Sequence, residues 1–172
     1  MRDYTVKELA RRLSCAIDWP RQFVGVRFLF TEEEFRSVEA IELQKPLYFC
    51  QMVRAATCGN AVKAAEEAQK CPGAICALGI IEPNELHRSG RRAFGNQLYH
   101  DFGTAKYSRD RQTRCDHKAF GVLVKPLSQY DESEPPPHVI QIITNPYHAM
   151  RIIQGYTYYY GIYTHFKMSG LQ

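Results

Sequence analysis

Apolar residues recur with the spacing of a helix near the start of the chain, and further on they form short continuous runs. Residues 3–17 repeat apolar side chains every three or four positions, with charged side chains between them. This spacing predicts a helix with one buried face, and we interpret Cys15 as part of its core. Pro20 prevents the helix from running on because proline lacks the amide hydrogen that a helix needs.

Three short apolar runs predict strands that are buried in the protein. They cover residues 22–30, 119–125 and 138–144, and they are rich in β-branched and aromatic side chains. Together with the helices they indicate a single α+β domain over residues 1–172, in which a small mixed sheet is covered by helices. No internal repeat of roughly 20–50 residues is present, which argues against a solenoid or a propeller.

Start and stop signals predict helices between the first two strands. Thr31 and Glu34 have the spacing of a capping box, so a short helix should begin after Thr31. Strong helix formers over residues 48–57 predict another helix, which Gly59 would end. Residues 60–70 are helical by composition, but their apolar side chains are all small, and an edge strand is an equal alternative.

The second half of the chain combines a weakly periodic basic segment with a strong helix signal. Residues 88–118 are predicted to form a loop with one helix near 104–114. Asn145 and Pro146 are typical of an N-cap and the first helical residue, and this helix should run to about Tyr160. Several tyrosines in and after it are interpreted as core and interface residues, with an aromatic pocket or a base-stacking surface as the alternative: Tyr156, Tyr158, Tyr159, Tyr160 and Tyr163.

The composition is that of an ordinary globular protein. Hydrophobic residues make up 45% and charged residues 23% of the 172 positions, enough to bury a core without disulfides. The N-terminal sequence MRDYTVKELARRL is charged throughout, unlike a signal peptide, and no apolar run approaches the ~20 residues that span a bilayer. We therefore expect a cytoplasmic protein without a membrane partner, whose six cysteines are reduced thiols, metal ligands or redox groups.

The positive charge is concentrated in one segment. The chain carries a net charge of +4, and residues 88–118 contain eight Lys and Arg against three Asp. Binding of nucleic acid or of another anion through this segment is one hypothesis. A solvated basic loop is the simpler interpretation, and no aromatic platform is interleaved with the charges. We therefore rank this hypothesis last.

The region from residue 48 to residue 81 holds four of the six cysteines, and Cys71 is the distinctive one. It precedes Pro72 and Gly73, which predicts that Cys71 is the N-cap of a helix through Gly79. Unpaired backbone N–H groups at such a position favour a thiolate, and a glycine behind it lets a ligand approach the backbone. Cys71 is thus a candidate nucleophile or metal ligand. A buried cysteine packed at a turn is the structural alternative.

The remaining cysteines are better explained by packing. Cys76 lies among apolar residues and is predicted to be core, and Cys58 should pack at a helix end. Cys115 and His117 form only a weak metal pair. None of the cysteines forms a CxxC pair, so the usual spacing of a structural zinc site is absent. The serine-hydrolase, P-loop, zincin and dinucleotide-binding motifs are also absent, and whether the chain is an enzyme stays open.

Five segments carry a resemblance to a known family by their order along the chain: GVRFLFTEEEF, YFCQMVRAATCG, CPGAICALGI, VLVKPL and HVIQIITNPYHAMRIIQGY. Over about residues 5–172 they resemble the domain of unknown function 169 family, an archaeal and bacterial group described as cysteine-rich. The matching residues are Cys50, Cys71, Gly73, Gly79 and the Asn145-Pro146 turn. The family offers no activity to carry over. Its chains look longer and continue with further cysteine-bearing segments, so we expect this chain to lack a C-terminal portion.

The leading hypothesis is a cytoplasmic, cysteine-centred protein of anaerobic or archaeal metabolism. It would bind a metal, an iron–sulfur centre or a metal-containing cofactor through Cys50 and Cys71, with Gly73 beside the cofactor, because thiolates suit such soft centres. The second hypothesis is an enzyme that uses Cys71 as a nucleophile or redox thiol. A small molecule or metal cofactor is the expected partner, and a homo-oligomer is left open.

Overall fold

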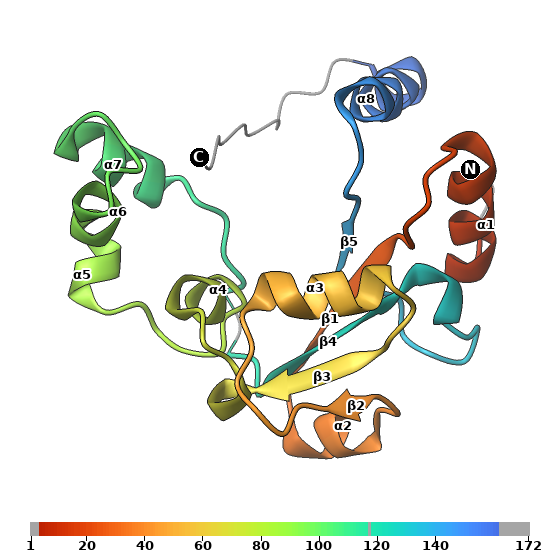
Figure 1. Cartoon of the computed structure of the whole chain (residues 1–172), viewed down its shortest axis with the longest axis horizontal. Helices are drawn as coiled ribbons and strands as arrows, with labels where there is room; N and C mark the ends of the chain where they lie inside the picture. Colours follow the sequence, from red (N-terminus) through yellow and green to blue (C-terminus); the bar gives the residue numbers. More distant parts are fainter. Residues whose placement is uncertain (1–3, 117, 162–172) are drawn as a thin grey trace.

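The computed structural model describes residues 4–116 and 118–161 of the chain (Figure 1). The strands are β1 (Val24–Leu29), β2 (Ile41–Glu42), β3 (Val62–Ala65), β4 (Gly121–Pro126) and β5 (Val139–Gln141). They form one mixed sheet in the order β2–β3–β4–β1–β5, in which only the β2–β3 pair is parallel. The three predicted strands correspond to β1, β4 and β5, and the predicted α+β class is confirmed.

Helices cover this sheet and extend beyond it. They are α1 (Val6–Ala16), α2 (Glu32–Ser37), α3 (Phe49–Thr57), α4 (Pro72–Ala77), α5 (Glu85–Arg88), α6 (Arg91–Gly95), α7 (Phe102–Asp110) and α8 (Pro146–Tyr160). In Figure 1, α3 and α4 lie on one side of the sheet and α2 lies on the other. The helices α5, α6 and α7 form a separate lobe, and α8 stands away from the sheet beyond β5.

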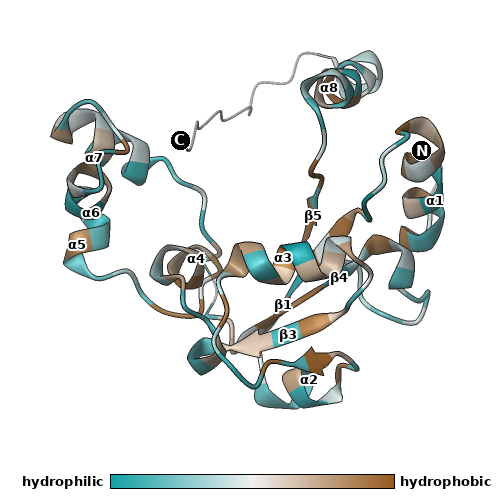
Figure 2. Cartoon of the chain, viewed as in Figure 1, coloured by the Kyte–Doolittle hydropathy of each residue, from teal (hydrophilic) through white to brown (hydrophobic). Residues whose placement is uncertain are grey.

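One face of the sheet, here called the apolar face, packs against α3. Its strand residues are Val24, Val26 and Phe28 of β1, Val122 and Val124 of β4, and Val62 and Ala64 of β3. Met52 and Val53 of α3 and Ile75 of α4 belong to the same buried cluster. Figure 2 shows the strands in largely hydrophobic colours, with a hydrophilic band within β3. Two helices that begin far apart in the sequence are therefore fixed on one core.

The opposite face, here called the cationic face, carries three buried basic side chains on three neighbouring strands. They are Arg27 of β1, Lys63 of β3 and Lys125 of β4. Lys63 donates hydrogen bonds from Nζ to the carbonyl oxygens of Phe35 at 2.8 Å and Val38 at 3.0 Å. It thereby satisfies carbonyls at the end of α2, where a cation also complements the helix dipole.

Tyr130 covers the cationic face beside these charges. Its ring lies so close to Gly25 that a Cβ atom at Gly25 would come within 2.6 Å of a ring carbon. Burial raises the pKa of the Tyr130 hydroxyl above its ordinary range, and the nearby Glu134 carboxylate adds to this effect. The Lys125 ammonium lies 4.4 Å from the centre of the same ring. Glycine at position 25 is therefore needed for the close approach of the tyrosine.

The local helix signals are confirmed. The Thr31 hydroxyl accepts a hydrogen bond from the Glu34 amide at 3.1 Å, and the Glu34 carboxylate accepts one from the Phe30 amide at 2.7 Å. The carboxylate thus reaches one residue further back than in a standard capping box. Cys71 is the N-cap of α4 with Pro72 as the first helical residue, and the Asn145 side chain caps α8.

The segment 60–70 is a correction to the helical interpretation. Residues 62–65 form β3, and a single 3₁₀ turn, Glu66–Ala68, follows it. β3 is also not an edge strand, because the two residues of β2 pair along its outer side. Small apolar side chains fit this position because β3 is packed under α3 on one face and beside α2 on the other.

Two further expectations are wrong for the described residues. The helix expected near 104–114 corresponds to α7, but two further short helices, α5 and α6, precede it where a loop was expected. The tyrosines of α8 do not form core: Tyr158 is 84% exposed, and Tyr156, Tyr159 and Tyr160 are also exposed. Tyr163 lies outside the described residues. α8 contacts the rest of the protein through residues such as Ile152, and the His148 ring meets Trp19 edge-on.

Candidate functional site

The two candidate cysteines follow two chain segments that lie side by side. Leu47 and Gln69 form an isolated parallel bridge, and the Lys70 amide donates to the Leu47 carbonyl at 2.9 Å. Bridge partners lie roughly 5 Å apart. Cys50 is three residues beyond Leu47, and Cys71 is two residues beyond Gln69. The bridge therefore places side by side the two chain segments that lead to Cys50 and Cys71, which are 21 residues apart in the sequence.

Each cysteine is held by the start of a helix. Cys50 is the second residue of α3 and is exposed, whereas Cys71 is the half-buried N-cap of α4. The α3 start is fixed by the Gln51 side chain, which accepts a hydrogen bond from the Tyr48 amide at 2.9 Å. The Cys71 carbonyl accepts a hydrogen bond from the Ile75 amide at 3.0 Å. Figure 1 shows the N-terminal end of α3 directed toward α4.

Gly73 leaves open space beside this pair. A Cβ atom at Gly73 would meet no other atom within 4 Å. The close approach that the sequence suggested is therefore sterically available from solvent. We call Cys50, Cys71 and Gly73 together the two-cysteine site. In the described residues no group of three or more His, Cys, Asp and Glu side chains could hold a metal ion. A metal at this site would therefore draw on Cys50 and Cys71 alone among the described His, Cys, Asp and Glu side chains.

The other thiols occupy different surroundings. Cys15, expected in the core, is exposed, because the buried side of α1 is formed by Ala10 and its neighbours. Cys58 caps the end of α3 as expected, but it is exposed, and its sulfur accepts a hydrogen bond from Arg21 Nη1 at 2.9 Å. Cys76 is buried as predicted.

A second pair of cysteines lines one cavity that the sequence did not indicate. Cys76 and Cys115 both border a space of about 420 Å³, together with Arg114 and Lys118. The Cys115 amide donates to the Ala77 carbonyl at 2.9 Å, which fixes this segment beside α4. Burial raises the pKa of the Cys76 thiol, with nearby arginines opposing the shift. Cys76 is therefore held as a neutral thiol near pH 7. His117, which was considered with Cys115 as a weak metal pair, lies outside the described residues.

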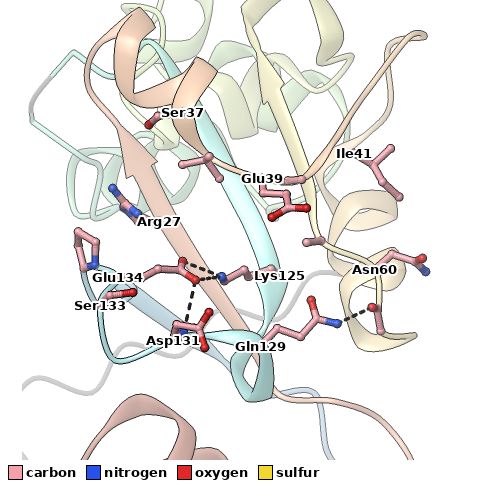
Figure 3. Close-up of a pocket in the computed structure, with 15 residues that line it drawn as sticks. Arg27, Ser37, Glu39, Ile41, Asn60, Lys125, Gln129, Asp131, Ser133 and Glu134 are labelled. Atoms are coloured by element: carbon pink, nitrogen blue, oxygen red, sulfur yellow. Dashed lines mark hydrogen bonds and ion pairs between the residues drawn. The ribbon is translucent and has the colours of Figure 1, made fainter.

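A larger cavity lies on the cationic face, and Figure 3 shows its lining. We call it the arginine cavity. Its volume is about 930 Å³, within the range typical of small-molecule sites. Its charged lining residues are Arg27, Lys125, Glu39, Asp131 and Glu134. Lys125 Nζ contacts both carboxylate oxygens of Glu134 at 2.7 Å, which forms a partly buried ion pair.

Sequence reasoning missed the arginine cavity although one signal was present. Arg27 and Lys125 each interrupt an apolar run that is otherwise typical of a buried strand. A charge inside such a run has to be paired or to face a polar space, because burying it alone is costly. In the basic segment 88–118, in contrast, some of the cations are neutralised by ion pairs: Arg88 pairs with Glu82 at 3.1 Å, and Lys106 pairs with Asp110 at 2.9 Å.

The fold and these sites define an α+β domain with a pair of solvent-accessible cysteines at the starts of two helices. The chain belongs to the DUF169 family, described as an uncharacterised ArCR family, whose match covers residues 12–172. It is 24% identical over 170 residues to the uncharacterized protein MJ0308 of Methanocaldococcus jannaschii, covering 97% of this chain and 71% of that protein. No solved structure matches the chain. The resemblance inferred from five ordered segments is thereby confirmed.

The search for membrane-spanning elements was negative for the part of the chain that the structure describes. Across residues 4–116 and 118–161, every helix is too short or too polar to cross a bilayer.

Proposed function

We propose that this protein binds a soft metal ion, an iron–sulfur centre or a metal-containing cofactor through the two-cysteine site. One observation supports the proposal most directly: the Leu47–Gln69 bridge holds the segments leading to Cys50 and Cys71 side by side. Thiolates are the protein ligands preferred by such soft centres. A reducing cytoplasm, where we place the protein, would keep both thiols available for coordination.

The number of protein ligands available at the two-cysteine site indicates which kind of metal group fits it. Soft metal sites in proteins commonly use about four ligands, whereas the described residues contain no group of three or more His, Cys, Asp and Glu side chains that could hold a metal ion. A cofactor that carries its own ligands, or a metal shared with a second protein chain, therefore fits better than an ion enclosed by this chain alone. The open space at Gly73 gives such a group room beside Cys71. In this arrangement the chain would anchor and orient the group through two sulfur bonds.

The test is metal analysis of protein purified without oxygen, with matched cysteine variants. We expect a stoichiometric amount of metal in the parent protein and its loss in both Cys50→Ser and Cys71→Ser. Cys15→Ser is the matched control, because Cys15 is exposed like Cys50 but lies on α1. It should retain the metal. Metal-free parent protein with an intact fold, or retention of metal in both site variants, would contradict the proposal.

The same preparations test the alternative of a Cys71 nucleophile or redox thiol. Iodoacetamide labelling followed by mass spectrometry gives the alkylation rate of each cysteine separately. If Cys71 is a metal ligand, chelator treatment should accelerate its alkylation, while the rate at Cys15 stays constant. If Cys71 instead reacts faster than Cys15 and Cys50 in metal-free protein, and chelator has no effect, the thiol-enzyme hypothesis replaces the metal site.

A further inference from the structure

The arginine cavity contains a buried cation with spare hydrogen-bonding capacity. Arg27 is 7% exposed, yet within residues 4–116 and 118–161 it forms a single ion-pair contact of 3.3 Å, from Nη2 to Glu34 Oε1. The other oxygen of that carboxylate accepts a hydrogen bond from the Phe30 amide. A guanidinium has five N–H donors in a fixed fork that matches a carboxylate. Arg27 therefore presents donors to the cavity that Glu34 does not use.

The second buried cation of the cavity is already neutralised. Lys125 is 5% exposed, and both of its 2.7 Å contacts go to the Glu134 carboxylate. Glu134 in turn accepts a hydrogen bond from the Asp131 amide of its own loop at 3.3 Å, so the carboxylate is held both by the loop and, through Lys125, by β4. This pair forms the floor of the cavity in Figure 3, between Arg27 on one side and Glu39 on the other. Arg27 is thus the cation available to a ligand.

Acceptors dominate the rest of the lining. No ion pair joins the Glu39 or Asp131 carboxylate to another residue in the described parts of the chain. Gln129 Nε2 donates to the Gly59 carbonyl at 2.8 Å, and Asn60 Nδ2 donates to the Ala55 carbonyl at 3.3 Å. Their side-chain carbonyl oxygens remain as acceptors. This part of the cavity is therefore suited to a positively charged donor.

We propose that the arginine cavity binds a small zwitterionic metabolite of the amino-acid class. Its carboxylate pairs with the Arg27 fork, and its ammonium group is received by Glu39 and Asp131. A simple anion such as phosphate would satisfy Arg27 but would meet two carboxylates. A simple diamine would satisfy the carboxylates but leave Arg27 without a better partner. A ligand that carries both charges matches both sides, and this site is independent of the two-cysteine site.

The first experiment uses probes that differ only in their charged groups. The full chain is titrated by isothermal calorimetry and ligand-observed NMR with 4-aminobutyrate, succinate and 1,4-diaminobutane, which share a four-carbon chain. The proteinogenic L-amino acids and inorganic phosphate are tested in the same way. We expect one or more zwitterions to bind, and succinate, phosphate and the diamine to bind at least about tenfold more weakly. Absence of binding by every zwitterion would overturn the proposal, as would equal binding of succinate or the diamine.

The second experiment assigns the binding to the cavity by matched variants. Glu39→Gln should weaken the best zwitterion about tenfold, because an ion pair becomes a neutral hydrogen bond. Glu42→Gln is the control, because Glu42 is also exposed but does not line the cavity. Arg27→Lys keeps the buried charge and removes the fork, and it should weaken carboxylate binding to a similar degree. Circular dichroism verifies the fold of each variant. Unchanged affinity in both Glu39→Gln and Arg27→Lys would show that the ligand binds elsewhere.

Discussion

The two faces of the central sheet are buried by different means. On the apolar face, Val26 of β1 lies opposite Val124 of β4, and both pack under α3. On the cationic face, Arg27 lies one residue along from Val26, and Lys125 lies one residue along from Val124. The same two strands thus supply nondirectional apolar contacts on one side and directed polar contacts on the other.

We expect the apolar face to determine mainly the stability of the protein and the cationic face to be the one suited to binding a ligand. The apolar face depends on excluding water, so any unpaired charge placed there should unfold the protein. The cationic face depends on particular partners, such as the carbonyls that accept from Lys63 and the carboxylate that pairs with Lys125. Because it already accommodates charge, it has a polar cavity that a ligand can enter. Four substitutions test this contrast, and they follow in order of decreasing expected effect.

Val124→Asp should abolish stable folding. Val124 is fully buried in the middle of β4, and an isolated carboxylate there would cost several kcal/mol of a total stability of about 5–15 kcal/mol. Urea unfolding followed by circular dichroism measures the effect. The matched control is Val139→Asp on edge strand β5, where the side chain is 46% exposed and the change should be small. Similar losses in both variants would contradict the assigned core.

Glu134→Gln should destabilise the protein by about 3 kcal/mol, because it leaves the buried Lys125 ammonium without its counter-charge. Lys125→Met should cost less, because the Glu134 carboxylate that it leaves unpaired can be solvated. The Glu134 side chain is 28% exposed, whereas that of Lys125 is 7% exposed. The double variant should recover part of the loss. A double-mutant cycle from urea unfolding gives the coupling between the two residues. Additive effects would show that the ion pair contributes nothing.

Gly25→Ala should cost about 1–3 kcal/mol, because the new methyl group would overlap the Tyr130 ring. Gly73→Ala is the control, since open space surrounds that position and alanine is the better helix former. The two melting temperatures should therefore move apart, with Gly73→Ala unchanged or raised. A neutral Gly25→Ala would mean that Tyr130 is not fixed against β1.

Glu34→Gln should have the smallest effect, and only its pH dependence is diagnostic. The Phe30 amide, and after it Arg27, lower the pKa of the Glu34 carboxyl from 4.5. Because the pKa of Glu34 is lower in the folded than in the unfolded protein, its carboxylate stabilises the fold at pH values above the unfolded-state pKa. This stabilisation is lost as the pH falls through the folded-state pKa. Because Glu34 is partly exposed, the effect should stay under about 1 kcal/mol. Parallel urea titrations at neutral and acidic pH should show a flatter profile for Glu34→Gln.

Local features of the fold were predictable from the sequence, and long-range pairings were not. The caps at Thr31, Cys71 and Asn145 are formed by neighbouring residues, so their spacing alone was sufficient. Composition left residues 60–70 undecided between a helix and an edge strand, and pairing with both β2 and β4 is what makes residues 62–65 a strand inside the sheet. Tertiary context often overrides such weak propensities.

At the candidate sites, too, local features were predictable from the sequence and long-range pairings were not. Cys71 could be singled out because its helix start is local, whereas the pairing of the segment before it with the segment before Cys50 depends on a bridge between residues 47 and 69. The arginine cavity needs the antiparallel register of β1 and β4, which sets Gly25 opposite Lys125 and Arg27 opposite Leu123. Nothing in either apolar run specifies that register by itself.

Because Trp19 contacts α8, the fluorescence of this tryptophan should report whether α8 is docked on the rest of the protein. Trp19 is the single tryptophan in the chain, and its ring centre lies 6.4 Å from that of His148. Its fluorescence therefore originates at the junction between α8 and the cluster around Tyr130. Movement of α8 away from that cluster would change the emission while the sheet remains folded. Tryptophan emission recorded together with far-UV circular dichroism can thus distinguish release of one helix from loss of the whole structure.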